Sequence, residues 1–155
     1  MMDYFRLSSL NVLVVDDSKL MLQYLKELLI SIGFDSGKIK TVDRYKSGAK
    51  LLNQVFDLVI CDYHLDDGYN GIELIELLRC NGVIRQHTIC IMASGETSKV
   101  IVQRCISARI DDYMVKPFDM ALVKARVLRS VSKIKITAGG VDINGHSSKK
   151  KRVQW

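Results

Sequence analysis

Five polar side chains stand directly after short apolar segments of this 155-residue sequence. They are Asp16, Asp17, Asp62, Ser94 and Lys116. Three carboxylates gathered in one place repel one another and keep raised pKa values unless a cation neutralises them. A hard, oxygen-seeking ion such as Mg²⁺ meets that need. A carboxylate beside Mg²⁺ and a lysine can also attack phosphorus and form an aspartyl phosphate, so this set predicts phosphoryl chemistry.

Each of these residues taken alone has a simpler interpretation. The pair Asp16 and Asp17 can cap a following helix and favour its dipole, and Asp62 can start a turn. Ser94 can be a helix cap and Lys116 a solvated surface cation. The position of all of them at the ends of apolar segments favours one shared site.

The segments that must position these side chains alternate between short apolar runs and amphipathic stretches. We expect strands at 10–15, 38–42, 58–61, 88–93 and 113–115, and helices at 18–32, 45–55, 72–80, 97–108 and 118–132. This alternation predicts parallel strands joined by right-handed crossovers, hence an open, doubly wound α/β domain with a five-stranded parallel sheet. In such sheets ligands bind outside the carboxyl ends of the strands, where the five polar residues stand.

The formal net charge of +6 lies almost entirely in the C-terminal part of the sequence. Residues 133–155 hold six Lys and Arg and one Asp, which leaves 17 basic and 16 acidic side chains in residues 1–132. We therefore expect one domain at 8–133 and a basic linker or tail at 134–155, either unstructured or added artificially. A nearly neutral body gives no electrostatic footprint for nucleic acid, so we expect no nucleic-acid binding by the domain.

The cysteines and the apolar content indicate where the protein works. Four cysteines, at 61, 80, 90 and 105, show no CxxC spacing, which argues against a disulfide framework or a zinc site. No apolar run approaches the 18 residues typical of a membrane span, and the first ten residues do not resemble a signal peptide. We expect a cytoplasmic protein that has no membrane partner.

Five motifs, taken together, resemble the receiver domain of two-component response regulators. They are Val-Val-Asp-Asp-Ser at 14–18, Asp-Leu-Val-Ile-Cys-Asp at 57–62, Gly-Ile-Glu-Leu at 71–74, Met-Ala-Ser-Gly at 92–95 and Asp-Tyr-Met-Val-Lys-Pro-Phe at 112–118. The resemblance implies a flavodoxin-like (βα)5 fold with strand order 2-1-3-4-5. It also implies a signalling phosphoacceptor, not an enzyme that acts on other substrates.

The resemblance also implies a role for each site residue. Asp62 would accept the phosphoryl group, with Lys116 and Ser94 assisting. Asp16, Asp17, Asp62 and the backbone carbonyl of His64 would bind Mg²⁺. Ser94 and Tyr113 would couple phosphorylation to a change at the surface. The peptide bond before Pro117 would be cis.

The partners that the resemblance implies are a sensor histidine kinase or phosphotransfer protein, and a downstream protein or fused effector domain. The partner-binding face would consist of the fourth helix, the fifth strand and the fifth helix, and a homodimer could form through it. Helical periodicity predicts that five cationic side chains are exposed on this face. They could bind acidic or phosphorylated partners, or they could be a solvated surface with no partner. They are Lys99, Arg104, Lys124, Arg126 and Arg129.

Two other functions and one departure from the family pattern remain. A pseudo-receiver would act only as a protein-interaction module, although the acidic pair, Asp62 and Lys116 are all retained. A haloacid-dehalogenase-type phosphatase would need a second Asp two residues after Asp62, where His64 stands. The family usually has Pro at the position of Asp66, and the extra charge of Asp66 and Asp67 bears on metal affinity and on the lifetime of the phosphoryl group.

Overall fold

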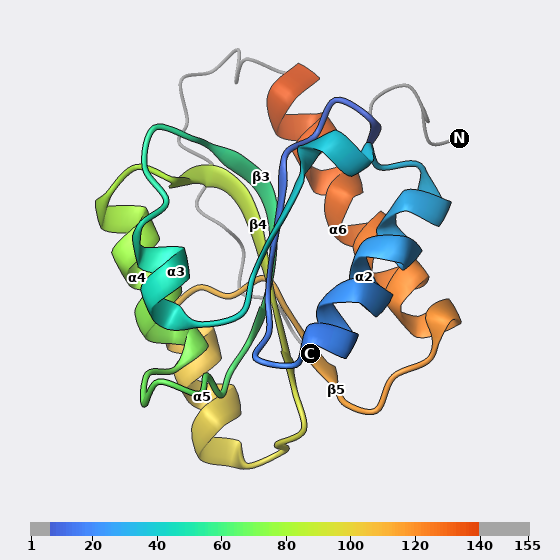
Figure 1. Cartoon of the computed structure of the whole chain (residues 1–155). Coiled ribbons are helices and arrows are strands. Elements are labelled where there is room, and N and C mark those ends of the chain that lie inside the picture. Colours follow the sequence, from blue (N-terminus) through green and yellow to red (C-terminus); the bar gives the residue numbers. More distant parts are fainter. Residues whose placement is uncertain (1–6, 140–155) are drawn as a thin grey trace.

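Five apolar segments pair in parallel to form one sheet in the computed structural model, which describes residues 7–139 (Figure 1). The strands are β1 (Val12–Val15), β2 (Ile39–Val42), β3 (Phe56–Asp62), β4 (Ile84–Ser94) and β5 (Asp112–Val115). Their order is β2-β1-β3-β4-β5, and every neighbouring pair is parallel. The predicted five-stranded, flavodoxin-like α/β fold is confirmed.

Five α-helices cover the two faces of this sheet (Figure 1). They are α2 (Lys19–Ile32), α3 (Tyr45–Ala49), α4 (Gly71–Cys80), α5 (Lys99–Ser107) and α6 (Met120–Gly139), and a short 3-10 helix spans Ser36–Lys38. Helices α2 and α6 lie on one face, and α3, α4 and α5 lie on the other. The sheet is therefore covered on both sides, which is why β1 has no exposed residue.

The helix that leads away from the first strand begins and ends where its sequence signals stand. The Ser18 hydroxyl accepts a hydrogen bond from the Met21 N–H, and this cap starts α2 directly after the two acidic residues. Gly33 ends the helix with a φ of 129°, a conformation that favours glycine. The buried side of α2 is the predicted apolar stripe, with Leu22, Leu25 and Ile32 among its members.

Three boundaries differ from the prediction by four residues or more. The second helix ends at Ala49, before the expected residue 55, and Asn53 has a φ of 60°, which no α-helix accommodates. Strand β4 begins at Ile84, before the expected residue 88. The last helix continues to Gly139, because Val131 and Ile134 extend its buried stripe at helical spacing. Residues 140–155, most of the predicted tail, lie outside the described residues.

The cysteines are free thiols, as predicted. Cys61, Cys90 and Cys105 are buried, and Cys80 is exposed. Burial raises the pKa of Cys105 to about 11, so this side chain behaves as a packed thiol. Within residues 7–139, no helix combines the length and the apolar content needed to cross a membrane.

Four of the five cations predicted to be exposed on the partner-binding face are exposed, and Arg126 is partly buried. Three of the five also have partners that the sequence did not reveal. Arg126 and Arg129 on α6 hold the buried Asp112 carboxylate, with nitrogen–oxygen distances of 2.7 and 3.0 Å. Arg104 donates to the Tyr63 hydroxyl at 3.3 Å. Helical periodicity predicts which side of a helix these arginines occupy. It does not predict which residue of another element they contact.

Arg126 is expected to contribute more to stability than Arg129. Its side chain is 30% exposed, against 57% for Arg129, and it makes the shorter contact to Asp112. Arg126→Ala should lower the free energy of unfolding by about 2 kcal/mol, because it weakens a hydrogen-bonded pair around a buried charge. Arg129→Ala should cost less than about 1 kcal/mol, as is usual for exposed pairs. Urea unfolding of both variants measures the difference, and equal losses would contradict this ranking.

Candidate functional site

The carboxyl ends of the three central strands and β5 meet at one edge of the sheet. Val15 pairs with Cys61, which places Asp16 beside Asp62. Asp62 in turn pairs with Ala93, and Ser94 pairs with Val115. The register therefore brings together the predicted residues from four separate segments, as expected for a parallel sheet.

Three carboxylates form a compact cluster at this edge. One oxygen from each of Asp16, Asp17 and Asp62 lies within 4.8 Å of the others. Asp16 is 1% exposed and Asp62 is 6% exposed, whereas Asp17 is only partly buried. The cluster thus has two shielded members and one that faces the solvent.

Lys116 is the cation of the cluster. Its Nζ donates to Asp16 Oδ2 at 2.6 Å and lies 3.3 Å from Asp62 Oδ2. The Lys116 N–H also donates to the Ser94 carbonyl at 2.8 Å, which holds the lysine next to the end of β4. The peptide bond between Lys116 and Pro117 is cis, as the family resemblance implied.

Burial and crowding shift the pKa values of the cluster. Burial, a hydrogen bond with Asp66 and the charges of neighbouring carboxylates raise the pKa of Asp17 from 3.8 to about 6. Burial also raises the pKa of Asp62, against the lowering effect of Lys116. Burial opposes the charge on Lys116, but Asp16 and Asp62 outweigh it and raise the pKa of the lysine. One ammonium therefore does not neutralise three carboxylates, and this all-oxygen donor set fits a hard divalent cation.

The pKa of Asp17 predicts a pH dependence of stability. A carboxyl whose pKa is higher in the folded state adds most to the free energy of unfolding at low pH, where it is protonated in both states. This stabilisation is lost as pH rises from about 4 through 6. We expect the melting temperature in EDTA to fall over this range. Asp17→Asn should flatten the dependence and melt higher than the wild type at pH 7. Thermal melts across pH test this, and an unchanged profile in the variant would contradict it.

The two predicted switch residues are connected through the backbone of Glu96. The fully buried Ser94 hydroxyl accepts a hydrogen bond from the Glu96 N–H at 3.3 Å. The Tyr113 hydroxyl donates to the Glu96 carbonyl, and its ring is 7% exposed. The loop after β4 thus contacts both side chains, and the Tyr113 ring is directed inward.

His64 has a side-chain partner that the sequence did not reveal. Its Nε2 lies 2.5 Å from Glu96 Oε1, which joins the loops after β3 and β4 across the entrance of the site. Both side chains are largely exposed, and neither belongs to the acidic cluster. The role of the His64 backbone carbonyl as a metal ligand stays a prediction.

The loop after β3 is anchored to α3. The Asp67 carboxylate accepts hydrogen bonds from the N–H groups of Tyr45 and Lys46 at 3.4 and 3.0 Å. The rings of Tyr45 and Tyr69 stack with their centres 3.8 Å apart. Asp67 is therefore a cap for a neighbouring helix, whereas Asp66 contacts Asp17 and belongs to the site. Sequence reasoning missed this division because the partners lie more than 20 residues apart.

Comparisons with known proteins agree with this geometry. A family model described as the response regulator receiver domain matches residues 12–128. The chain is 27% identical over 119 residues to chemotaxis protein CheY-3 of Vibrio cholerae, a match that covers 77% of this chain and 89% of the relative. It is 30% identical over 115 residues to two-component response regulator ORR21 of rice, Oryza sativa, covering 74% of this chain and 16% of that protein.

A solved structure shows the same arrangement. Response regulator DrrB, a Thermotoga maritima OmpR/PhoB homolog, superposes with a TM-score of 0.68 at 27% identity, over 80% of this chain and 53% of that one. This chain therefore spans about half of the Thermotoga protein and a small part of the rice protein. With the acidic cluster at the carboxyl edge of its sheet and a family match over most of its length, the chain belongs to the response regulator receiver domains, and its fold is CheY-like.

Proposed function

We propose that this receiver domain works in the cytoplasm and accepts a phosphoryl group on Asp62 from the phosphohistidine of a sensor histidine kinase or phosphotransfer protein. The observation that supports this most directly is the contact of Lys116 with both Asp16 and Asp62 beside the acidic cluster. An interaction module that needed no phosphorylation would have no use for a lysine shared between two buried carboxylates.

The transfer itself needs few protein groups. An Asp62 carboxylate oxygen attacks phosphorus, a new oxygen–phosphorus bond forms, and the bond from phosphorus to the histidine nitrogen breaks. Lys116 neutralises charge on the phosphoryl oxygens, and the Ser94 hydroxyl donates a hydrogen bond to one of them. Because Asp62 is partly desolvated and its pKa is raised, it is a better nucleophile than a fully hydrated carboxylate.

Mg²⁺ is the cation that this donor set would hold. Asp16, Asp17 and Asp62 would be its ligands, with the His64 carbonyl completing the set. When bound, it supplies positive charge to the phosphoryl oxygens and removes the repulsion among the three carboxylates. The contact of Asp66 with Asp17 places a further acid next to this site, so Asp66 would also influence metal affinity.

The output would use the surface formed by α5, β5 and α6. The Ser94 hydroxyl accepts from the Glu96 N–H, and it would donate to a phosphoryl group on Asp62. Movement of Ser94 toward Asp62 would shift the loop of Glu96, whose carbonyl accepts from the Tyr113 hydroxyl. Val100, Val115, Met120 and Leu122 are exposed apolar side chains on these three elements. A downstream protein, a fused effector domain or a second copy of the domain would bind there.

The direct test is intact mass spectrometry after incubation with acetyl phosphate and Mg²⁺. We expect one added phosphoryl unit, its loss on hydroxylamine treatment, and no addition when EDTA replaces the metal. A solved relative described as a BeF3-activated DrrB receiver domain supports a parallel measurement with beryllium fluoride. An unmodified wild type would favour the alternative of a pseudo-receiver that acts only through protein interactions.

Lys116→Ala is expected to separate metal binding from switching. The variant keeps all three carboxylates, so its affinity for Mg²⁺ should stay near that of the wild type or increase. The phosphorylation-driven change in the Tyr113 environment should be lost, because the cation that pairs with the phosphoryl group is absent. Metal titration and Tyr113 NMR signals in beryllium fluoride measure the two properties. If metal affinity fell as far as in Asp17→Ala, Lys116 would have another role.

A further inference from the structure

A groove of about 850 Å³ runs along the open edge of the sheet. Strand β2 is an edge strand because its only neighbour in the described sheet is β1. Helix α2 lines one side of the groove, and α3 with the segment that follows it lines the other. In Figure 1 this edge faces the reader, with β2 between the two helices.

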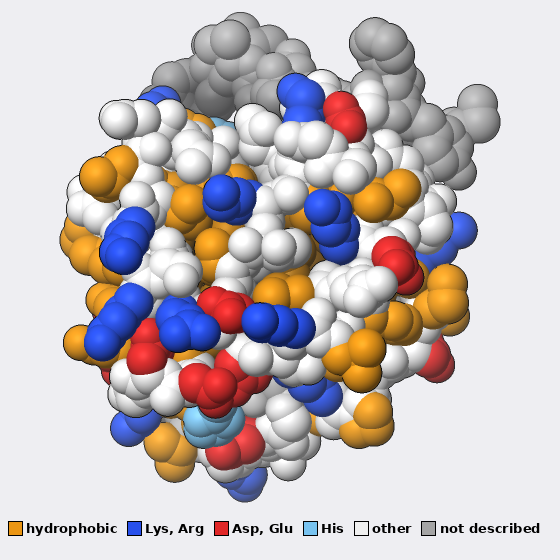
Figure 2. All heavy atoms as spheres, in the orientation of Figure 1, with side chains coloured by type: hydrophobic (Ala, Val, Ile, Leu, Met, Phe, Trp, Pro, Cys, Tyr) orange, Lys and Arg blue, Asp and Glu red, His pale blue; other side chains and the backbone are white. Residues whose placement is uncertain are grey.

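Four lysines from separate elements line this groove. Lys19 and Lys26 come from α2, Lys40 from β2, and Lys50 from the end of α3. Within the part of the chain that the structure describes, none of them forms an ion pair. The one acidic side chain in the lining, Asp43, lies 3.0 Å from an arginine and also interacts with Lys19, which lowers the pKa of Asp43 together with that arginine. Figure 2 shows Lys and Arg side chains over this face, with apolar side chains between them. With four lysines and one aspartate in its lining, the groove has an excess of positive charge.

The open strand offers unpaired backbone groups to a ligand. The Asp16 N–H donates to the Val42 carbonyl, so the backbone polar groups of Val42 are directed toward β1. Successive residues of a strand turn these groups to opposite sides, which directs the N–H and C=O of Thr41 out of the sheet. Thr41 also lines the groove. An extended chain laid beside β2 could therefore form hydrogen bonds with Thr41.

The groove also has an apolar component. Leu22, Val42 and Leu51 form part of its lining and are nearly buried, and Leu52 is 56% exposed at its margin. A ligand with acidic side chains alone would leave Leu52 in water. A segment that combines acidic and aliphatic residues would cover Leu52 and also pair with the lysines.

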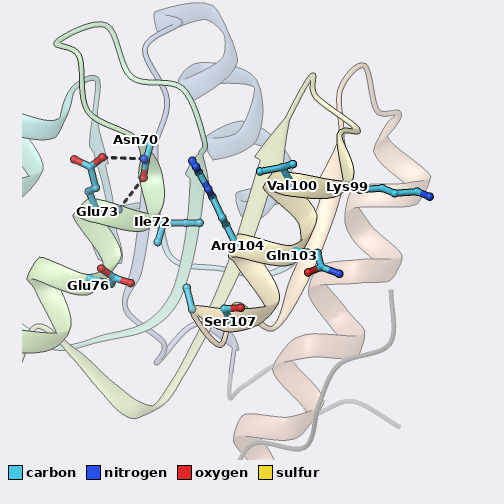
Figure 3. A pocket seen from close by; sticks show the side chains of 10 residues that line it. Asn70, Ile72, Glu73, Glu76, Lys99, Val100, Gln103, Arg104 and Ser107 are labelled. Atoms are coloured by element: carbon cyan, nitrogen blue, oxygen red, sulfur yellow. Dashed lines mark hydrogen bonds between the residues drawn. The ribbon is translucent and has the colours of Figure 1, made fainter.

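The groove between α4 and α5 lacks this uniform charge (Figure 3). Its acidic and basic side chains occur together, and Glu73 is hydrogen-bonded to Asn70. Arg104 is committed to the Tyr63 hydroxyl, and Lys99 points away from the groove. Of these two grooves, the one along β2 is therefore the better match for an acidic ligand.

We propose that the groove along β2 binds an extended acidic segment of a partner protein, which adds as a strand to the open edge of the sheet. The basic segment 133–155 of this chain, with six Lys and Arg and one Asp, would be repelled by the four lysines. The occupant is therefore a separate chain with acidic and aliphatic residues. This surface is distinct from both the phosphoryl site and the face of α5, β5 and α6.

The test uses two dye-labelled heptapeptides, Val-Glu-Glu-Val-Glu-Glu-Val and the same sequence with Lys in place of Glu. The side chains of a strand alternate between the two faces of the sheet, as shown by Ile39, which packs in the core beside α2, and Val42, which packs in the core beside α3. In an added strand, two consecutive glutamates would therefore face the two opposite walls of the groove. We expect fluorescence anisotropy to show binding of the acidic peptide only. Its affinity should weaken severalfold as NaCl rises from about 0.05 to about 0.3 M. The backbone amide signal of Thr41 should shift in NMR spectra.

Variants separate the charge contribution from the backbone contribution. Lys26→Glu combined with Lys40→Glu should weaken binding by about tenfold or more. The matched control, Lys99→Glu combined with Lys124→Glu, makes the same change in net charge on a distant surface and should bind as the wild type does. Thr41→Pro removes one outward N–H while keeping every lysine, and an edge strand tolerates proline at such a position. It should also lose the acidic peptide, with the far-UV circular dichroism of a folded domain.

Four results would overturn the proposal. Equal binding of both peptides, or no binding, would mean that the lysines only protect an open edge from self-association. A single-stranded oligonucleotide that bound more tightly through the same lysines would assign the groove to nucleic acid. A concentration-dependent dimer lost in the Lys26 and Lys40 variant would assign it to a second copy. Unaltered binding by Thr41→Pro would exclude strand addition. Phosphorylation of Asp62 should be unchanged in every groove variant, so the two proposals can fail separately.

Discussion

Asp62→Asn should abolish phosphorylation by acetyl phosphate while leaving the domain folded. The amide is no nucleophile toward phosphorus, and the neighbouring carboxylates are poorly placed to replace Asp62. Asp16 is 1% exposed and holds Lys116 at 2.6 Å, and Asp17 shares a hydrogen bond with Asp66. Intact mass after incubation with Mg²⁺ should therefore show no added phosphoryl unit.

The same variant should be more stable than the wild type at pH 7 in EDTA. Burial raises the pKa of Asp62, so its ionised form costs free energy in the folded state. An amide of the same shape removes that cost. The difference in melting temperature should shrink as pH falls toward 4, where the wild-type carboxyl becomes protonated in both states.

Glu96→Gln is the matched control for Asp62→Asn. Glu96 is an exposed carboxylate at the entrance of the same site, and its side chain contacts only His64 among the interactions described. Its neutralisation should leave one phosphoryl unit on the protein. A phosphoryl group that remained on Asp62→Asn would mean that another residue is the acceptor.

Gly71→Ala should destabilise the domain by about 3 kcal/mol, at the upper end for overpacked sites. An added Cβ would stand 2.3 Å from the Asp62 carbonyl oxygen and 2.9 Å from Cys61 Sγ. The Asp62 carbonyl belongs to the backbone and cannot rotate away as the end of a flexible side chain can. Either α4 or the end of β3 must therefore move. For a domain of this size the loss corresponds to a fall in Tm of roughly 10 °C. The displacement would reach Asp62, and phosphorylation should slow as well.

Gly95→Ala provides the comparison for Gly71→Ala. A Cβ at Gly95 would meet no atom within 4 Å, and its φ is not in the left-handed region. Its melting temperature should therefore stay within about 2 °C of the wild type, as for most exposed positions. Intrinsic helix preference alone would make Ala better than Gly at position 71, at the start of α4. A stabilised Gly71→Ala variant would therefore show that the close approach to Asp62 is not a constraint.

Local patterns were sufficient for much of the fold. The apolar runs at 10–15 and 58–61 predicted two strands, which the structure has as β1 and as part of β3, and β1 and residues 58–61 are buried. The cap at Ser18 and the stop at Gly33 marked the limits of the first long helix. These features are readable because each depends on residues within a few positions of one another. The second helix was predicted to be too long, because the apolar residues after Ala49 were assigned to it. In the structure they belong to an irregular segment.

The candidate site was also readable in outline. Parallel strands bring their carboxyl ends to one edge, so the sequence pattern alone places Asp16, Asp62 and Lys116 together. The partner of Arg126 and Arg129 could not be predicted, because the buried carboxylate that they hold lies on β5, at least 14 residues earlier in the chain. Spacing along one helix contains no information about a partner on another element.

The sequence by itself therefore determined the order of elements, the nearly neutral body and the acidic residues with their lysine. The tertiary structure alone decided which charges are shared. It divided the two additional acids, so that Asp66 contacts Asp17 while Asp67 caps α3. It also gathered four lysines around one aspartate in the groove along β2. The physical reason is that electrostatic interaction depends on distance and burial in space, and these are set only when distant segments pack together.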